Sequence, residues 1–99
     1  MRNKDFQMEK IFTVITGGLG GLGTAFADEY AHLGKNILLI DRHPEGTALV
    51  SHLQNKYDVN IRYMQCDLAS SHERQSLFTN FHEENLLFNG LINVVGQEI

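Results

Sequence analysis

The chain has 99 residues and a mass of 11.2 kDa, which fits one small domain and excludes two independent ones. Twelve acidic and eight basic side chains give a net charge of -4, and the basic residues form no cluster, so nucleic acid and acidic membranes are not expected partners. A single cysteine, Cys66, excludes an internal disulfide bond and favours a reducing compartment. We therefore expect one cytoplasmic domain that is only marginally stable alone.

Neither a targeting segment nor a metal site is predicted. No apolar run approaches the roughly 20 residues of a membrane span, and the N-terminus lacks the apolar stretch of a signal peptide. Residues 1–9 are polar and mixed in charge, so we expect a flexible leader there and a single domain over residues 10–99. The five histidines never have the spacing that places two on one helical face, and they are better read as surface residues.

Four short apolar runs, at residues 11–16, 36–41, 60–67 and 91–96, have the length of β-strands. The first, second and fourth runs are nearly continuous in Ile, Val and Leu, which is typical of strands buried on both faces of a parallel sheet. The three segments between these runs have apolar residues at helical spacing.

The first two helical segments follow the first two strands. In the first segment, four apolar residues fall on one face: Leu22, Phe26, Tyr30 and Leu33. Gly34 follows as the residue that ends this helix. In the second segment, Pro44 can lie near the first helical position. The apolar stripe of the second helix is Leu49, Leu53 and Tyr57.

The third helical segment begins at Ser70, which with Glu73 has the spacing of a capping box. Its inward face is expected to consist of Leu77, Phe78 and Phe81. Strands that alternate with single helices predict right-handed crossovers and a parallel sheet covered on both sides. We therefore expect an α/β fold, a Rossmann-like doubly wound sheet of four strands in the order 3-2-1-4 with three helices.

The sequence TGGLGGLG, residues 16–23, lies between the first strand and the first helix and is called the glycine loop below. Glycines allow a tight turn with positive φ, close approach of the backbone to a pyrophosphate, and close packing of helix on strand. The N–H groups at the helix start would then receive the phosphates. Two registers fit and stay open: Gly18, Gly20 and Gly23 form G-x-G-x-x-G, whereas Gly17, Gly21 and Gly23 form G-x-x-x-G-x-G.

Asp41 ends the second strand, 24 positions after Gly17, where a carboxylate can accept hydrogen bonds from an adenosine ribose. Strand, glycine loop, helix, strand and acid thus occur in the order that dinucleotide binding requires. Because a 2′-phosphate would meet like charge at Asp41, the sequence favours NAD over NADP. Arg42 lies beside it and could tolerate that phosphate, so NADP stays open.

These motifs resemble the N-terminal part of a short-chain dehydrogenase/reductase, over about residues 10–97. The matching features are T-G-x-x-x-G-x-G in the glycine loop, the acid at position 41, Cys-Asp-Leu at 66–68 and LINVVG at 91–96. The glycine loop also resembles that of polyketide ketoreductases, which usually carry a basic residue where Asp41 stands.

The resemblance implies a role for each matching residue. In such proteins the glycine loop binds the coenzyme phosphates, and the acid at the position of Asp41 contacts the ribose. Asp67 would then lie beside the adenine, and Asn93 would support the sheet behind the coenzyme. The implied cofactor-binding residues are Thr16, Gly17, Gly21, Leu22, Gly23, Asp41, Arg42, Asp67, Leu68, Asn93 and Gly96. Asp67 has a second reading, as the N-terminal anchor of the third helix. Cys66 is better read as a buried inert thiol than as a nucleophile.

The chain departs from the family pattern in two places. On the fourth strand, Val94 and Val95 replace the second Asn and the Ala of the family's N-N-A-G motif. The family's catalytic Tyr-x-x-x-Lys is absent, because no tyrosine of this sequence is followed by lysine four positions later. Family members are well over twice this length, so we expect a truncated form and assign no catalytic residue.

The sequence therefore predicts the coenzyme-binding portion of an NAD(P)-dependent short-chain dehydrogenase/reductase. If a missing C-terminal half completes it, the implied reaction is hydride transfer between a nicotinamide and an alcohol or carbonyl. The alternatives are a non-catalytic nucleotide-binding or interaction module, and a fold fragment that binds nothing. Because the fourth strand is expected at an unshielded edge, we also expect a homodimer or larger assembly through that edge.

Overall fold

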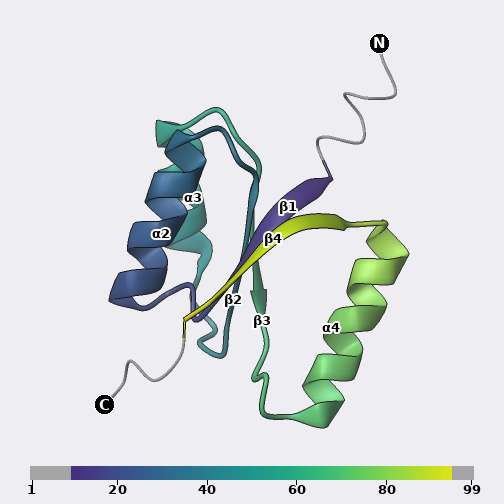
Figure 1. Cartoon of the computed structure of the whole chain (residues 1–99). Helices are drawn as coiled ribbons and strands as arrows, with labels where there is room; N and C mark the ends of the chain where they lie inside the picture. Colours follow the sequence, from purple (N-terminus) through teal and green to yellow (C-terminus); the bar gives the residue numbers. More distant parts are fainter. Residues whose placement is uncertain (1–9, 95–99) are drawn as a thin grey trace.

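Figure 1 shows the computed structural model of the chain, which is described over residues 10–94. Strands and helices alternate along the described residues: β1 (Ile11–Thr16), α2 (Gly21–His32), β2 (Ile37–Asp41), α3 (Thr47–Lys56), β3 (Ile61–Gln65), α4 (Ser71–Glu84) and β4 (Leu87–Asn93). The predicted order of elements is confirmed. The predicted flexible leader, residues 1–9, lies outside the described residues.

The four strands form one parallel sheet in the order β3-β2-β1-β4. The predicted fold class, a Rossmann-like doubly wound α/β sheet with three helices, is therefore confirmed. In a parallel sheet the carboxyl ends of all strands meet at one edge. That edge carries the glycine loop after β1, Asp41 at the end of β2 and Asp67 after β3.

Helices cover both faces of the sheet, α2 and α3 on one face and α4 on the other (Figure 1). Alternate side chains of a strand point to opposite faces. On β2, Leu39 packs with Ile15 and with Leu53 of α3, whereas its neighbour Leu38 packs with Leu77 of α4. Leu38 and Leu39 are both fully buried, so β2 is buried on both faces as predicted.

Helix α2 meets the sheet through small residues rather than through the predicted large ones. Its buried residues are Gly23, Ala27 and Ala31, whereas Leu22 and Leu33 are 56% and 60% exposed. The prediction was wrong at these two leucines because the helix faces the sheet with the small side chains of Gly23, Ala27 and Ala31. These let the helix axis lie close to the strands, and the two leucines point away from the core. Phe26 and Tyr30 do pack against the core, at its margin.

The ends of the helices follow the predictions in part. Gly34 ends α2 with a φ of +88°, as predicted. Pro44 was wrongly placed near the start of α3, because the helix begins at Thr47 and its N-cap is Gly46. Leu49, Leu53 and Tyr57 all pack on the core as predicted.

Helix α4 begins with the predicted cap. The hydroxyl of Ser70 accepts a hydrogen bond from the backbone N–H of Glu73, 3.2 Å away. The Glu73 side chain accepts from the N–H of Asp67 at 2.8 Å, so the second half of the capping box is made one turn earlier than expected. Leu77 and Phe81 face the core, but Phe78 is 60% exposed, so its predicted inward orientation was wrong.

Strand β4 differs most from its prediction. It runs from Leu87 to Asn93 rather than over 91–96, and its first pairing joins Leu87 to Ile11 of β1. The pairing register shifts after Phe12, so that Asn89 forms a bulge, and its side chain accepts a hydrogen bond from Thr13 at 3.0 Å. Positions 95 and 96 lie outside the described residues.

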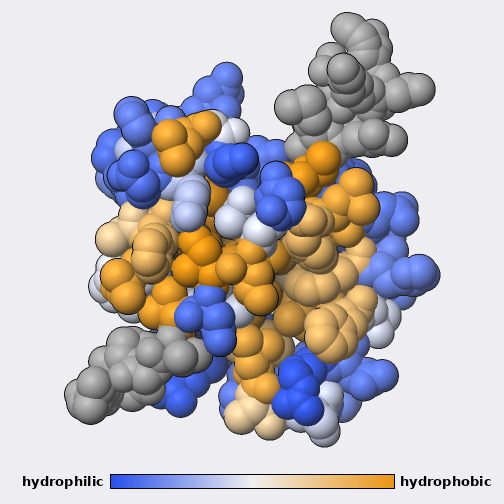
Figure 2. Space-filling model, in the orientation of Figure 1, coloured by the Kyte–Doolittle hydropathy of each residue, from blue (hydrophilic) through white to orange (hydrophobic). Residues whose placement is uncertain are grey.

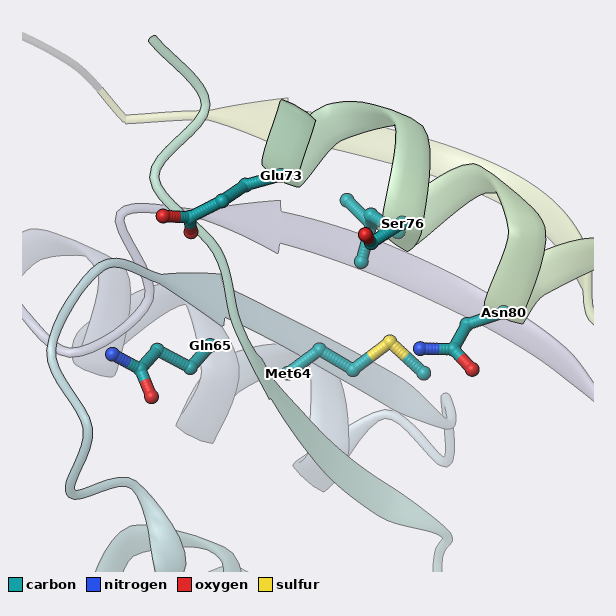
Figure 3. Close-up of a pocket in the computed structure, with 6 residues that line it drawn as sticks. Met64, Gln65, Glu73, Ser76 and Asn80 are labelled. Atoms are coloured by element: carbon teal, nitrogen blue, oxygen red, sulfur yellow. The ribbon is translucent and has the colours of Figure 1, made fainter. Parts of the chain in front are cut away.

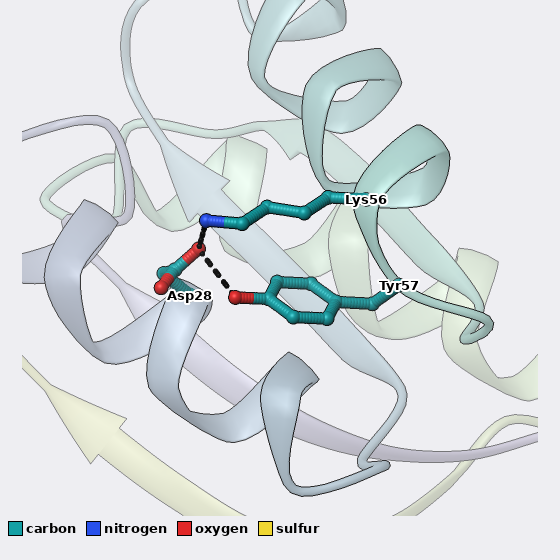
Figure 4. Close-up of polar contacts among 3 residues, drawn as sticks. All are labelled: Asp28, Lys56 and Tyr57. Atoms are coloured by element: carbon teal, nitrogen blue, oxygen red, sulfur yellow. Dashed lines mark hydrogen bonds and ion pairs between the residues drawn. The ribbon is translucent and has the colours of Figure 1, made fainter.

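A polar cluster joins the two helices on the first face of the sheet (Figure 4). The Asp28 carboxylate on α2 accepts hydrogen bonds from Lys56 Nζ at 3.1 Å and from the Tyr57 hydroxyl at 3.0 Å. These two bonds lower the pKa of Asp28 below its ordinary value. The cluster ties the end of α3 to the middle of α2.

Candidate functional site

The glycine loop turns directly from β1 into α2, whose first residue is Gly21. Gly17 has a φ of +70°, which L side chains rarely adopt. A Cβ atom at this position would lie 2.4 Å from the carbonyl oxygen of Val94, beyond the end of β4. The N–H groups of Gly17 and Gly18 both donate to the carbonyl of Ile40, at 2.8 and 3.2 Å. Glycine is therefore required at position 17 by the fold itself.

The other glycines of the loop differ in what surrounds them. A Cβ atom at Gly23 would lie 2.3 Å from the carbonyl oxygen of Gly17, and one at Gly18 would lie 2.7 Å from the Leu39 side chain. At Gly21 it would meet no atom within 4 Å. Packing within the chain thus explains Gly17, Gly18 and Gly23, whereas Gly21 faces open space.

The start of α2 presents backbone donors toward the loop. The first hydrogen bond of the helix runs from the N–H of Thr24 to the carbonyl of Gly20, at 2.9 Å. The N–H groups of Gly21, Leu22 and Gly23 precede that bond, and no side chain caps the helix. These donors and the positive end of the helix dipole form a site suited to an anion.

Asp41 ties the end of β2 to the glycine loop. One oxygen of its carboxylate accepts the N–H of Leu19 at 3.0 Å, and the other accepts the N–H of His43 at 3.3 Å. The side chain is half-buried, so it remains open on one side to solvent. A carboxylate has about four acceptor positions, and two backbone donors leave capacity for ribose hydroxyls.

Side chains of β3 hold the segment that follows Asp41, and the sequence reasoning missed them. The Tyr63 hydroxyl lies within donor distance of the carbonyls of Asp41, at 3.1 Å, and His43. Gln65 donates from Nε2 to the carbonyl of Arg42 at 3.1 Å. The signal was available, because the predicted strand order puts the polar end of the third strand beside Asp41.

Asp67 is joined to the start of α4 at three atoms. Its carboxylate accepts the N–H of Ala69 at 3.0 Å, its carbonyl accepts the N–H of Ser70 at 2.9 Å, and its own N–H donates to Glu73. This is the geometry of the helix anchor that the sequence left as one of two readings. Leu68 follows in the same turn and is 37% exposed.

The thiol of Cys66 is buried, as predicted. Burial raises its pKa, and the negative charges of Glu73 and Asp67 raise it further. A thiol held protonated in this way is a poor nucleophile.

Asn93 closes the carboxyl edge of the sheet on the other side of β1. Its side-chain oxygen accepts a hydrogen bond from the Thr16 hydroxyl, and the N–H of the next residue, Val94, donates to the Thr16 carbonyl at 3.1 Å. Thr16 itself is buried. Asn93 thus braces the strand that leads into the glycine loop. The remaining predicted residue, Gly96, lies outside the described residues.

Two hollows flank α4. One, of about 220 Å³, lies between β3 and α4 and is lined by residues drawn in Figure 3: Met64, Gln65, Glu73, Ser76, Leu77 and Asn80. The other, of about 480 Å³, is an almost wholly apolar groove between α4 and the β1 and β4 strands. Phe78, Phe88 and Leu91 line this groove and are 60%, 41% and 67% exposed. Figure 2 shows hydrophobic surface gathered on the face that carries β4 and α4.

Residues 10–94 contain no helix that is both long and apolar enough to span a membrane. Within the same range, no three His, Cys, Asp or Glu side chains are grouped so as to hold a metal ion. Along the described carboxyl edge, the groups open to a ligand include the backbone donors at the start of α2 and the carboxylate of Asp41.

Comparison with known proteins gives a consistent family. A model of the short chain dehydrogenase family matches residues 12–99. The chain is 35% identical over 63 residues to Hydroxysteroid dehydrogenase-like protein 1 of Gallus gallus. It is 36% identical over 59 residues to Very-long-chain 3-oxoacyl-CoA reductase of Mus musculus. These matches cover 63% and 59% of the chain but only 19% of each relative.

Solved structures share the fold. A bulky-bulky ketone specific alcohol dehydrogenase from Comamonas testosteroni superposes with a TM-score of 0.65 and 25% identity, over 78% of this chain and 33% of that one. A short-chain dehydrogenase from Sphingobium yanoikuyae, solved in complex with NADPH, gives a TM-score of 0.66 and 24% identity, over 77% and 31%. The chain thus spans about a third of these structures.

Proposed function

This chain belongs to the short-chain dehydrogenase family, and on that premise we propose that it binds a nicotinamide dinucleotide at the carboxyl edge of its sheet. The resemblance predicted from the glycine loop and Asp41 is thereby confirmed at the level of the family. The observation that carries the proposal is Gly21, whose missing side chain no contact within the described residues explains. A bare backbone beside three available N–H groups is what a bound pyrophosphate requires.

The phosphates are proposed to lie against the start of α2. In the register Gly17, Gly21 and Gly23, the first and third glycines are required by packing and the second leaves room for the ligand. Thr16 and Leu22 complete this segment, the first held by Asn93 and the second exposed at the helix start. The helix dipole adds a favourable interaction with the negative phosphates.

The adenosine ribose is proposed to bind at Asp41. Its carboxylate favours the two hydroxyls of NAD(H) and opposes the 2′-phosphate of NADP(H). Arg42 is exposed beside it and is the residue that would offset this repulsion. Asp67 and Leu68, in the turn after β3, are proposed to lie near the adenine, with Asn93 and Gly96 behind the coenzyme. NAD(H) is the preferred coenzyme on this reasoning, with NADP(H) weaker.

The reaction proposed for the complete enzyme is hydride transfer between a nicotinamide and an alcohol or carbonyl, with the coenzyme supplying the hydride chemistry. This chain would bind and orient the coenzyme, and a C-terminal half would supply the catalytic residues. A second candidate is a non-catalytic nucleotide-binding module, which the absence of Tyr-x-x-x-Lys from this sequence favours for the chain alone. A cytoplasmic location, proposed from the single cysteine, accompanies either reading.

We further propose that two chains associate through β4. This strand pairs with β1 on one side only within the described sheet, and Leu87 and Leu91 along it are 49% and 67% exposed. An exposed apolar edge strand favours pairing with a second copy, and a two-fold contact closes the assembly. The apolar groove beside α4 would be partly covered by the same contact.

Calorimetric titration of the purified chain with NADH and with NADPH tests the proposed function. We expect saturable binding of both, with NADH about ten- to a hundredfold tighter. Binding of neither coenzyme would refute the proposed function. Equal or tighter binding of NADPH would keep the dinucleotide site but remove Asp41 from its role at the ribose.

A further inference from the structure

We propose that Tyr63 is a positioning residue that fixes residues 41–43 and thereby controls discrimination between NAD(H) and NADP(H). The inference rests on the proposed function, since it takes Asp41 and Arg42 as the residues that meet the ribose. Tyr63 lies on the neighbouring strand; its hydroxyl contacts this segment, and its ring lies against Gly46, three residues further along the chain.

The ring of Tyr63 supports the loop between β2 and α3. A Cβ atom at Gly46 would lie 2.4–2.6 Å from Cγ, Cδ1 and Cδ2 of this ring. The loop can therefore cross the ring only because position 46 has no side chain. Gly46 is also the N-cap of α3, so the ring contacts the loop at the residue where the helix begins.

The hydroxyl of Tyr63 fixes the other end of the loop. It lies 3.1 Å from the Asp41 carbonyl and is also within reach of the His43 carbonyl, so its single hydrogen can serve either. The N–H of Cys66 donates to the same Asp41 carbonyl at 2.8 Å. The side chain of Gln65 donates to the carbonyl of Arg42, which lies between Asp41 and His43 in the chain. Three successive carbonyls thus face β3. Because peptide units are planar, fixing these carbonyls also fixes the directions in which the side chains of residues 41 and 42 leave the backbone.

The hydroxyl remains a donor at neutral pH. Burial raises the pKa of Tyr63, and the negative charge of Asp41 raises it further. The Tyr63 hydroxyl therefore keeps its proton and can donate it to the carbonyl of Asp41 or of His43. This contact differs from a general core contact, because the atoms it holds belong to the segment that presents one acidic and one basic side chain.

Discrimination depends on which of these two side chains the segment presents. Asp41 favours a ribose hydroxyl and Arg42 favours a phosphate, so a segment released from Tyr63 would sample both arrangements. Releasing it should weaken NADH binding and relax the preference. The N–H of Leu19, which donates to the Asp41 carboxylate, should also become less protected.

The test compares Tyr63→Phe with Tyr30→Phe by NADH and NADPH titration. Tyr63→Phe keeps the ring over Gly46 and removes the hydroxyl. Tyr30 is a matched control, because it packs at the core margin and its hydroxyl makes no hydrogen bond among residues 10–94. We expect Tyr63→Phe to lower the NADH-to-NADPH affinity ratio by about three- to tenfold, and Tyr30→Phe to leave it unchanged.

Two further measurements separate positioning from stability. In an Asp41→Asn background the effect of Tyr63→Phe on the ratio should shrink, because the part of it that is exerted through the Asp41 carboxylate is lost and only the part through Arg42 remains. Hydrogen exchange at the Leu19 amide should be faster in Tyr63→Phe than in Tyr30→Phe. If Tyr63→Phe does not fold, Gln65→Met, which releases the Arg42 carbonyl, should lower the ratio instead.

An unchanged ratio with unchanged Leu19 exchange in a folded variant would overturn the inference while leaving dinucleotide binding intact. A change that persists at full size in the Asp41→Asn background would also overturn it. If the unsubstituted chain binds neither coenzyme, the proposed function fails and this role in discrimination fails with it.

Discussion

The carboxylate of Asp41 accepts a hydrogen bond at 3.0 Å from the backbone N–H of Leu19, which lies 22 residues earlier in the chain. This hydrogen bond joins Asp41, which we propose to bind the ribose, to the middle of the glycine loop, which we propose to bind the phosphates. Substitutions at position 41 must therefore be judged by coenzyme affinity and by stability together.

Asp41→Asn and Asp41→Ala separate these two roles. Asn keeps one side-chain oxygen for the Leu19 N–H but removes the charge and the acceptor of the longer, exposed bond from the His43 N–H. NADH affinity should therefore fall by about tenfold, with only a small loss of stability. Ala removes the acceptor of the Leu19 N–H as well, and should in addition lower the free energy of unfolding by about 1–2 kcal/mol. Calorimetry and urea unfolding measure the two effects. Equal stability of both variants would show that the loop bond contributes nothing.

Gly21→Ala and Gly23→Ala distinguish a ligand role from a packing role. A Cβ atom at Gly21 meets open space, so Gly21→Ala should fold with unchanged or slightly higher stability and yet bind NADH at least about tenfold more weakly. A Cβ atom at Gly23 would lie 2.3 Å from a backbone oxygen, so Gly23→Ala should be destabilised by more than about 1 kcal/mol. Full NADH affinity in Gly21→Ala would place the phosphates elsewhere.

The purified chain should show no coenzyme-dependent oxidation of alcohols or sugars above background. No tyrosine is followed by lysine four positions later, and general acid-base catalysis typically supplies about 10²–10⁴ in rate. Steady-state assays across a substrate panel measure this. Turnover that survives repeated purification and follows the chain through the column would disprove it.

Leu91→Lys should disrupt association through β4. Leu91 is 67% exposed on the edge strand, and an added charge there opposes strand pairing and burial of the neighbouring apolar side chains. Light scattering at micromolar concentration should give a dimer or larger for the unsubstituted chain and a smaller species for the variant. Leu33→Lys is the control, because Leu33 is 60% exposed just after α2 and away from β4. A monomeric unsubstituted chain would refute the proposed association.

Asp28→Asn should reduce the acid sensitivity of folding. The folded-state pKa of Asp28 is lowered from 3.8 by its bonds to Lys56 and Tyr57, so its contribution is present above that value and is lost as pH falls through the lower folded pKa. Between about pH 5 and 2, the free energy of unfolding should therefore fall less in Asp28→Asn than in the unsubstituted chain. Urea unfolding at several pH values measures this. Added salt should shrink the Asp28 effect.

Several features of the fold and site follow from the local pattern, and others depend on contacts between distant residues. The strand order and the glycine loop follow from alternation and spacing. The burial of α2 does not, because the size of Leu22 and Leu33 says nothing about how closely the helix approaches the sheet. Gly23, Ala27 and Ala31 set that distance, and small residues at a four-residue spacing were the available signal.

The start of β4 and the role of Tyr63 were missed for related reasons. Asn89 and Gly90 interrupt the apolar run, and the bulge that accommodates them is formed by pairing with β1. Tyr63 carries no local motif, and its contact with Asp41 exists only once β2 and β3 are adjacent. Local sequence cannot specify either contact without the strand register.

The Val94 carbonyl lies 2.4 Å from where a Cβ of Gly17 would be, and Asn93 accepts the hydroxyl of Thr16 across 77 residues of chain. During synthesis, β1 therefore emerges from the ribosome long before the strand that supports its loop. A nascent chain that ends at β3 has β1 paired on one side only. It also lacks Asn93 and Val94, which lie beside Thr16 and Gly17 in the folded chain. We expect the loop to acquire its shape only after residue 94 has left the exit tunnel, so that coenzyme capture is a late event in biosynthesis.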